Sequence, residues 1–495
     1  MLVLQVLLMA VYGLCLLLLL GFSLTQWQLT RLARRAYAAP ARPEPPAPAT
    51  WPRLTVQLPI YNEQNVVERL IDTCAALDYP ADRLHVQVLD DSTDETVALA
   101  AARVAHHCAR GVRVSHVRRP ERTGFKAGAL AYGLQHTDGE LIAIFDADFL
   151  PQPDFLRRVV PHFFLDAPDN ARTGVVQTRW GHLNEDYSLL TELQAFGLNA
   201  HFFVEQVGRQ TGGHFINFNG TGGIWRRACI EDAGGWHADT LTEDLDLSYR
   251  AQLRGWQFRY LPRVAAPAEL PSTMDALKSQ QFRWTKGAAE TARKHLLDVW
   301  RSGQPLGTRL HATFHLLNSA VFVAILLMAV LSVPLVFVRA LGAEQLRPVF
   351  HMAALFLLTL VPLTVYFRTA WQQAARHRAA PAGFVGQLLL FLAFSMGLSL
   401  HNARAVVLGL AGQRSAFIRT PKLGLLAGTA SWQGRRYRTS PLLSGLTWLE
   451  GLLAAYFLFG IGAGLYLREF GLLPTHLLLA TGYGLVFYYS LKHAR

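Results

Sequence analysis

The stretch LIAIFDAD, residues 141–148, is an apolar run that ends in two aspartates one residue apart. A short run of this kind is typical of a buried β-strand, and the polar residues after it mark the end of the strand. Similar runs with β-branched residues lie upstream, at 54–58, 85–89 and 113–117. Helical patterns occur between them, at 65–77 and 94–107. Strands that alternate with helices predict an α/β unit with a mostly parallel sheet covered on both faces.

Polar clusters follow three of these predicted strands, at 59–63, 90–92 and 146–148. Sheets of this class bind their ligands at the carboxyl ends of the strands. We therefore expect the clusters to converge on one rim of a soluble domain that occupies residues 53–300.

The composition indicates a membrane protein. Of 495 residues, 51% are hydrophobic and only 17% are charged. The net charge of +12 is compatible with nucleic acid, an anionic membrane surface or phosphorylated substrates as partners. With apolar spans present, basic cytoplasmic loops are the simplest source of this charge, so we expect no nucleic-acid partner. The four cysteines form no C-x-x-C pair and predict neither a zinc site nor a disulfide framework.

Residues 3–23 are apolar for long enough to cross a bilayer. A signal peptide is the alternative, but no basic residue precedes the run, whereas Arg31, Arg34 and Arg35 follow it. The positive-inside rule then predicts an external N-terminus. We expect a transmembrane helix at 1–30 and a linker rich in Pro and Ala at 31–52.

The C-terminal third contains apolar runs at 313–338, 350–367, 384–400, 446–467 and 472–491. If all of them crossed, the basic stretch at 414–438 would lie outside, against the positive-inside rule. We therefore expect 384–412 to be an amphipathic helix on the cytoplasmic face. The prediction is five spans and a cytoplasmic C-terminus. It divides this third into two spans at 301–383, an interfacial helix and loop at 384–440, and two spans at 441–495.

Two aspartate clusters suit a nucleotide with its metal. Asp146 and Asp148 offer the hard oxygen ligands that Mg²⁺ and Mn²⁺ prefer when they bind phosphates, although a lone D-x-D is common by chance. Asp90 and Asp91 precede a helical pattern and are compatible with a helix cap. A carboxylate there could also accept a hydrogen bond from a nucleobase, and the two roles do not exclude each other.

The clusters at 124–128 and 242–244 provide a cation and a base. Lys126 lies between glycines before a helix start, where it could face a phosphate or simply point to solvent. Asp244 is our candidate for the base that removes a proton from an attacking hydroxyl, with Glu243 as support. The alternative is that Thr242 caps a helix with acids in its first turn. The loop at 218–223, with Asn219 and Gly220, allows a ligand to approach the backbone closely.

Gln280, Arg283 and Trp284 lie at helical positions i, i+3 and i+4, on one face. Arginine binds phosphate oxygens with two parallel hydrogen bonds, and tryptophan stacks on a sugar face. The alternative is an interfacial helix whose Trp and Arg are anchors among lipid headgroups.

Together these residues resemble the processive family 2 glycosyltransferases of the cellulose synthase superfamily, whose pattern is D, D-x-D, T-E-D and Q-x-x-R-W. The resemblance covers about residues 53–440, and the residues at 57–63, 218–221 and 269–273 are most similar to plant glucomannan synthases and xyloglucan-backbone glucan synthases. It implies a cytoplasmic GT-A domain, Rossmann-like with a mostly parallel sheet, joined to helical transmembrane segments.

The resemblance also implies roles for single residues. Asp91, with Asp90 beside it, would contact the nucleobase, and Asp146 and Asp148 would bind the diphosphate through Mg²⁺ or Mn²⁺. The implied donor-binding residues are completed by Glu63, Lys126, Gln280, Arg283 and Thr420, and the acceptor-binding residues are Trp284, Asn219 and Gly220. Asp244 would be the base. The gating loop of the family has the pattern F-x-V-T-x-K, which residues 417–422 match except that Arg419 replaces Val.

The function implied is the inverting transfer of a hexose from UDP-glucose or GDP-mannose to a growing β-glycan, a β-1,4-linked glucan or (gluco)mannan, with export. The expected location is a bacterial inner or plasma membrane, and an accessory export subunit stays open. One alternative is a glycolipid synthase that adds one sugar to a diacylglycerol or ceramide. Another is a non-enzymatic scaffold or transporter, which leaves the carboxylate clusters without a purpose.

Overall fold

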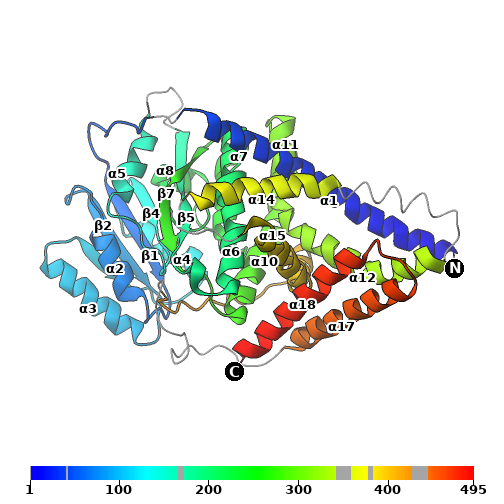
Figure 1. Cartoon of the computed structure of the whole chain (residues 1–495). Coiled ribbons are helices and arrows are strands. Elements are labelled where there is room, and N and C mark those ends of the chain that lie inside the picture. Colours follow the sequence, from blue (N-terminus) through cyan, green and yellow to red (C-terminus); the bar gives the residue numbers. More distant parts are fainter. Residues whose placement is uncertain are drawn as a thin grey trace.

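The computed structural model describes residues 2–40, 43–165, 172–341, 358–376, 383–425 and 444–494. These residues contain a seven-stranded sheet. The strand order is β3-β2-β1-β4-β6-β5-β7 (Figure 1). The strands are β1 (Leu54–Ile60), β2 (Leu84–Asp90), β3 (Val114–Val117), β4 (Leu141–Ile144), β5 (Thr173–His182), β6 (Gly223–Arg226) and β7 (Gln257–Ala268).

The pairing confirms the predicted α/β class with a mostly parallel sheet. β1, β2, β3 and β4 pair in parallel, and so do β5 and β7, whereas β6 runs antiparallel to both β4 and β5. All residues of β2 and β4 are buried, which is typical of parallel strands covered on both faces. The sequence patterns did not predict β5, β6 or β7.

Helices cover the two faces of the sheet and enclose separate cores. On one face, α2 (Val67–Ala75), α3 (Thr96–Ala109) and α5 (Phe155–Val159) cover a core that includes Val56, Val86 and Ala143. On the other, α4 (Phe125–Gln135), α8 (Arg227–Asp232) and α9 (Glu243–Leu253) cover Ile142 and Ile144. The alternation along β4 therefore divides its side chains between the two cores.

A second layer of helices lies between the sheet and the long apolar helices (Figure 1). α6 (Leu189–Ala200), the π-helical turn η4 (His201–Glu205) and α7 (Gln206–Thr211) follow one another without a break. α10 (Met274–Arg301) carries the Q-x-x-R-W residues and is followed by α11 (Leu306–Leu316). These helices connect the half of the molecule that contains the sheet to its apolar half.

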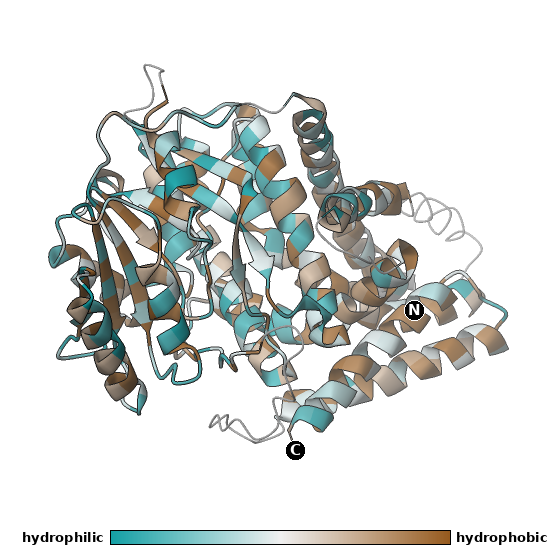
Figure 2. Ribbon diagram, turned by 60° about the vertical axis from the view of Figure 1, so that its left-hand side comes forward, coloured by the Kyte–Doolittle hydropathy of each residue, from teal (hydrophilic) through white to brown (hydrophobic). Residues whose placement is uncertain are grey.

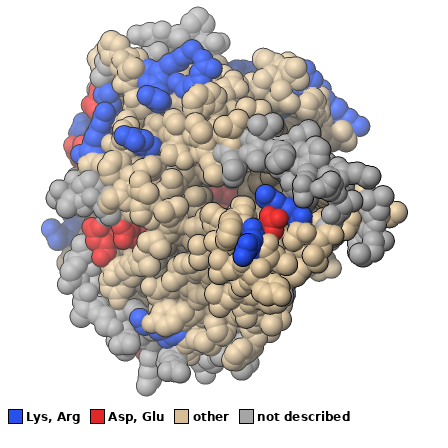
Figure 3. All heavy atoms as spheres, turned by 45° about the vertical axis from the view of Figure 1, so that its right-hand side comes forward, with Lys and Arg blue, Asp and Glu red and all other residues tan. Residues whose placement is uncertain are grey.

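Three helices in the described residues are long and apolar enough to cross a membrane, at 5–38, 318–341 and 445–466. They belong to α1 (Leu2–Ala38), α12 (Val321–Leu341) and α17 (Gly445–Tyr466), and brown apolar residues run along this part of the molecule in Figure 2. Uncharged side chains dominate the face shown in Figure 3. Because α1 continues to Ala38, the region expected to be a linker begins later than residue 31.

Five spans stay a prediction. The run at 350–367 lies largely outside the described residues, and its described part begins α14 (Leu360–Ala375). The run at 472–491 forms α18 (Leu473–His493), which is not among the three candidate spans. Polar residues such as His476 and Ser490 reduce its apolar character.

The segment expected to be one interfacial helix is two helices, α15 (Phe384–Gly397) and α16 (Ser399–Leu410), with a bend of 49° between them. As a pair they are long and apolar enough for a broken span or a re-entrant loop. Gly397 lies against the backbone of α18, because a Cβ there would be 2.3 Å from the Gly482 oxygen. Small residues thus let α15 and α18 pack backbone to backbone.

Candidate active site

One pocket brings together residues from strand ends, loops and α10. It holds about 820 Å³ of space between the atoms, counting space open to solvent. Most of the predicted site residues line it: Lys126, Asp146, Asp148, Asn219, Gly220, Glu243, Asp244, Gln280, Arg283 and Trp284. Residues far apart in the sequence therefore share one site. Of the three clusters expected at the strand ends, the one at 146–148 lines this pocket, and those at 59–63 and 90–92 are not part of its lining.

The two aspartates after β4 have different environments. Asp146 Oδ1 accepts a hydrogen bond from Lys126 Nζ at 2.6 Å, and its side chain is one-third exposed. Asp148 is 1% exposed, and its Oδ2 lies 2.7 Å from Lys422 Nζ. Within the described residues its Oδ1 has no hydrogen-bond partner. A buried carboxylate oxygen without a donor suits a bound cation, so this pair fits a divalent metal.

Lys126 is the cation at the centre of the acids. Gly124, with a φ of 71°, turns the chain into α4 and places Lys126 in the first turn. Its Nζ also donates to the Gly220 oxygen at 2.9 Å and lies 3.9 Å from Glu243 Oε1. Burial would lower the pKa of Lys126, but Asp146 and Glu243 raise it, so the group stays charged. It points into the site and not to solvent.

Glu243 and Asp244 begin α9 and lie beside the loop at Gly220. A Cβ added at Gly220 would be 3.0 Å from Asp244 Oδ2, and the φ of that glycine is 78°. Both features require glycine there. Burial and the charge of Glu243 raise the pKa of Asp244, against the effect of Lys126. No capping bond from the Thr242 side chain to α9 occurs in the described structure, so helix capping does not explain the cluster.

The Q-x-x-R-W residues Gln280, Arg283 and Trp284 of α10 contribute another part of the pocket lining. The indole of Trp284 lies 6.2 Å from that of Trp180 on β5, measured between ring centroids. Trp180, His182 and Leu198 also line the pocket, and the sequence patterns did not identify them. No separate signal in the sequence marked them, because Trp180 and His182 lie in β5, a strand that the patterns did not predict.

The loop at 417–422 covers the pocket. Phe417 stacks on Phe125 with ring centroids 5.4 Å apart, and the Arg283 guanidinium lies 5.1 Å from the Phe417 ring. Arg283 also donates to Thr420 Oγ1 at 2.8 Å. The Leu423 and Gly424 amides donate to the carboxylate of Glu269. Thr420, a predicted donor-binding residue, therefore contacts the Q-x-x-R-W helix.

Arg419, the departure from the gating-loop pattern, forms an ion pair with another predicted site residue. Its Nη1 lies 2.6 Å from Glu63 Oε2. Burial raises the pKa of Glu63 to about 7, although Arg419 opposes the shift. At the position where the family pattern has Val, the loop therefore carries a charged side chain that contacts Glu63.

Asp90 and Asp91 lie beyond the pocket lining as far as the structure describes it. The Asp90 side chain is fully buried and bonds to the Ser92 amide at 2.8 Å and to His116 Nε2 at 2.8 Å. Both oxygens of Asp91 accept from Arg119, at 2.7 and 2.6 Å. Asp90 therefore holds the strand end together, and contact of Asp91 with a nucleobase stays a prediction.

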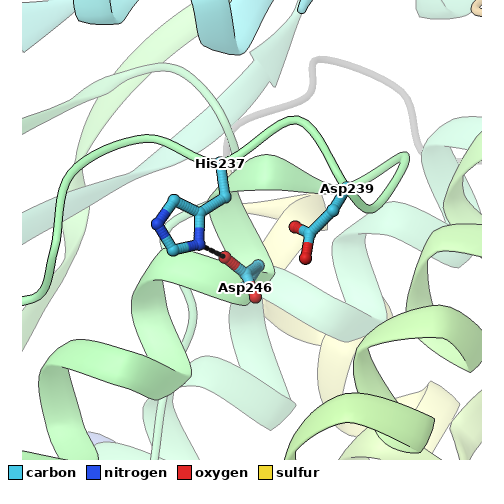
Figure 4. A group of neighbouring side chains, drawn as sticks. All are labelled: His237, Asp239 and Asp246. Atoms are coloured by element: carbon cyan, nitrogen blue, oxygen red, sulfur yellow. Dashed lines mark ion pairs between the residues drawn. The ribbon is translucent and has the colours of Figure 1, made fainter.

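A second group of possible metal ligands lies outside the pocket, at His237, Asp239 and Asp246 (Figure 4). Asp246 is fully buried, and its oxygens lie 2.7 Å from Lys294 Nζ, 2.8 Å from His295 Nε2 and 2.8 Å from Arg250 Nη2. Burial would raise the pKa of Asp246, but the hydrogen bond from His295 and the charges of Arg250 and Lys294 hold it below its usual value, so Asp246 already has its counter-charges. The cluster fastens α9 to α10 and does not need a metal.

Comparison with known proteins agrees with this geometry. A family model described as "Glycosyltransferase like family 2" matches residues 52–287. Glucomannan 4-β-mannosyltransferase 1 of Oryza sativa subsp. japonica is 36% identical over 397 residues, which cover 76% of this chain and 70% of that protein. Glucomannan 4-β-mannosyltransferase 2 of Arabidopsis thaliana is 37% identical over 393 residues, 76% of this chain and 68% of the relative.

Among solved structures, the chain is similar to the mannosyltransferase PcManGT of Pyrobaculum calidifontis in complex with GDP-Man and Mn²⁺. The TM-score is 0.52 and the identity 24%, over 73% of this chain and 97% of that one. The likeness shows that the two share their fold.

Proposed function

The chain belongs to glycosyltransferase family 2, in its cellulose synthase-like branch, and from this premise we propose that it transfers a hexose from a nucleotide sugar to a growing β-glycan at a membrane. One observation supports this most. The D-x-D, T-E-D and Q-x-x-R-W residues, together with Asn219 and Gly220, line a single pocket.

Asp244 is the proposed base of a single displacement with inversion at the anomeric carbon. The acceptor hydroxyl gives its proton to Asp244 as its oxygen bonds to the anomeric carbon and the nucleoside diphosphate departs. A pKa raised by burial makes Asp244 a better proton acceptor than an ordinary aspartate near neutral pH. Glu243 supports it through its charge and through its contact with Lys126.

Asp146 and Asp148 would hold Mg²⁺ or Mn²⁺. The metal, when bound, offsets negative charge on the departing diphosphate. Lys422 Nζ pairs with Asp148 Oδ2 and would compete with the metal for this carboxylate, whose Oδ1 has no hydrogen-bond partner among the described residues. Lys126 and Arg283 supply further positive charge, and Gln280, Glu63, Thr420, Asp90 and Asp91 complete the proposed donor site.

Mannose is the first candidate for the sugar, because both compared plant relatives are glucomannan 4-β-mannosyltransferases. GDP-mannose is then the preferred donor and UDP-glucose the second. We expect Trp284 to stack on the acceptor sugar and Asn219 and Gly220, which line the same pocket, to contact it. A glycolipid acceptor is a weaker candidate, since the relatives are named for a polysaccharide product.

The proposed location is a membrane, with the catalytic domain and C-terminus in the cytoplasm and the N-terminus outside. Large apolar side chains of α1 such as Leu14, 68% exposed, would face lipid. Arg31, Arg34 and Arg35 lie near the end of α1 that leads to the catalytic domain. Five spans and a bacterial inner or plasma membrane are the finer form of this proposal.

Incubation of the purified full chain with a panel of nucleotide sugars and Mg²⁺ or Mn²⁺ tests the function. We expect release of nucleoside diphosphate from GDP-mannose or UDP-glucose and a ladder of chain lengths from labelled donor. A single lipid-soluble product would identify a glycolipid synthase. Absence of turnover with every sugar would refute the proposal.

A further inference from the structure

A partly buried chain of polar side chains connects the pocket to the apolar helices, and the proposed reaction does not yet use it. It starts in the π-helical turn η4, at His201 and Glu205. Single π-turns in helices are rare, and those that occur are often found at functional sites. Glu205 is 6% exposed, and a glutamate is almost never this buried without partners.

Four donors surround the carboxylate of Glu205. Oε1 accepts from Gln26 Nε2 of α1 at 2.7 Å and from the Tyr366 hydroxyl of α14 at 3.0 Å. Oε2 lies 3.1 Å from His201 Nδ1 and 3.4 Å from Arg209 Nη2. Burial would raise the pKa of Glu205, but Arg209 and His201 lower it below its usual value. An ionised carboxylate only accepts hydrogen bonds, so His201 Nδ1 carries the proton.

The other nitrogen of the His201 ring contacts Asn219, which lines the pocket. Nε2 lies 3.2 Å from Oδ1 of Asn219, and Asn217 Nδ2 lies 2.7 Å from the same oxygen. The remaining amide atom of Asn219 is buried and has no hydrogen-bond partner among the described residues. Asn219 itself lines the pocket.

The orientation of the Asn219 amide does not change this conclusion. Oxygen and nitrogen of an amide are nearly the same in shape, so the amide can turn to suit the ring: Nε2 of a neutral His201 accepts from the Asn219 nitrogen, and Nε2 of a doubly protonated His201 donates to the oxygen. In both orientations one polar atom of Asn219 lacks a partner among the described residues. A sugar hydroxyl can donate or accept and would satisfy either atom.

Asn219 lies next to the reacting centre. Its neighbour Gly220 accepts from Lys126 Nζ at 2.9 Å and approaches Asp244 closely. The backbone N–H of Asn219 donates to Gln177 Oε1 at 3.0 Å, which fixes the backbone of the loop. His201 fixes the side chain, and Glu205 fixes the ring of His201.

We propose that His201 is a positioning residue that orients Asn219 toward a hydroxyl of the acceptor sugar. Glu205 holds the His201 ring, and through Gln26 and Tyr366 it fixes that ring against α1 and α14. This inference deepens the proposed function and rests on it.

The test compares His201→Ala with Tyr37→Phe in the full chain. Tyr37 donates to the Phe203 oxygen at 2.9 Å, so its substitution removes a bond to the same turn without touching His201, Glu205 or Asn219. The assay measures the KM of a β-1,4-linked hexose oligosaccharide, donor hydrolysis by water, and the Kd of the nucleoside diphosphate. For His201→Ala we expect the acceptor KM to rise about ten-fold, the size of one lost hydrogen bond, with the other two values within about two-fold.

Tyr37→Phe should leave all three values unchanged. Glu205→Gln keeps the shape of Glu205 and should raise the acceptor KM in the same direction, which gives a second measurement if His201→Ala fails to fold. An unchanged acceptor KM in a folded His201 or Glu205 variant overturns the inference. So does a parallel loss of Tm, diphosphate binding and transfer in both. If the wild-type chain turns over no nucleotide sugar, the proposed function fails instead.

Discussion

The proposed donor side and the proposed acceptor side of the pocket have different chemistry. On the donor side, charges of opposite sign pair across the cavity, as in Lys126 with Asp146 and Lys422 with Asp148. On the acceptor side, Trp180, Trp284 and Asn219 present neutral rings and an amide. The donor side suits a charged diphosphate and its metal, and the acceptor side suits an uncharged sugar.

The difference predicts which substitutions have large effects. Removal of one member of a buried ion pair leaves its partner uncompensated, which costs more than the loss of one ring contact. The effects of substitution on turnover and binding should therefore decrease from the proposed base Asp244, through the metal ligand Asp148 and Lys422 of the loop, to the ring of Trp284.

Asp244→Asn should have the largest effect, because the amide cannot take the proton of the acceptor hydroxyl. We expect kcat to fall by about 10²–10⁴-fold, the usual contribution of a general base, with nucleoside diphosphate binding retained. Steady-state transfer rates and calorimetric binding measure this. Asp239→Asn, an exposed acid near the same helix, is the matched control. Normal turnover of Asp244→Asn would exclude Asp244 as the base.

Asp148→Ala should distinguish nucleotide binding that depends on the metal from nucleotide binding that does not. It removes a buried oxygen ligand, so we expect metal-dependent nucleotide affinity to fall by about 10²-fold, in the range for loss of a metal-site interaction. Titration of nucleoside diphosphate with Mn²⁺ and with EDTA measures the difference. Asp154→Ala, at an exposed aspartate, controls for loss of negative charge. Equal metal dependence in Asp148→Ala and the wild type would argue against the metal assignment.

Lys422→Gln should strengthen metal binding, because a competing cation leaves Asp148. We expect the Mn²⁺ concentration for half-maximal nucleotide binding to fall about ten-fold, or ~1.4 kcal/mol. Arg414→Gln removes an exposed cation that precedes the loop and serves as control. A higher Mn²⁺ requirement would mean that Lys422 helps to bind the diphosphate instead.

Trp284→Phe should have a smaller effect, confined to the acceptor. The shorter ring retains part of the stacking, so we expect acceptor KM to rise about three- to ten-fold, in line with ~1 kcal/mol per aromatic contact. Donor KM should not change. Trp300→Phe, on the same helix and partly exposed, is the control. A change in donor KM alone would place Trp284 on the donor side.

The smallest effect is a shift in pH dependence. A raised pKa of Asp244 means that kcat/KM rises with pH through a value above that of an ordinary aspartate. Glu243→Gln removes a neighbouring negative charge, so the pKa of Asp244 should fall and the acid limb should move to lower pH. Full pH profiles of the variant and wild type measure this, with Asp239→Asn as control. A shift to higher pH would contradict the coupling.

The sequence predicted the half of the sheet that local patterns encode. β1, β2 and β4 were recognisable because short apolar runs end in polar clusters, and parallel pairing follows from the helices between them. β5, β6 and β7 were missed because their neighbours in the sheet come from distant segments. The π-turn at His201–Glu205 was also invisible, since its residues follow no separate pattern.

Within the site, the sequence predicted which residues carry reactive groups, but not which residues contact one another. Residue types at fixed spacing identified Asp146, Asp148, Asp244, Arg283 and Trp284. The burial of Asp90 between Ser92 and His116, and the cover of the pocket by Phe417 and Lys422, depend on segments that meet only in the folded chain.

By itself, the sequence determined the α/β class, the family resemblance and most of the pocket, because strand ends and helical faces impose short, regular spacings on reactive residues. Only the tertiary structure decided which charges neutralise each other, that Arg419 pairs with Glu63, and that His201 joins the pocket to α1 and α14. Those contacts span up to about 350 residues of chain, from Glu63 to Arg419, and no local spacing encodes a distance of that kind.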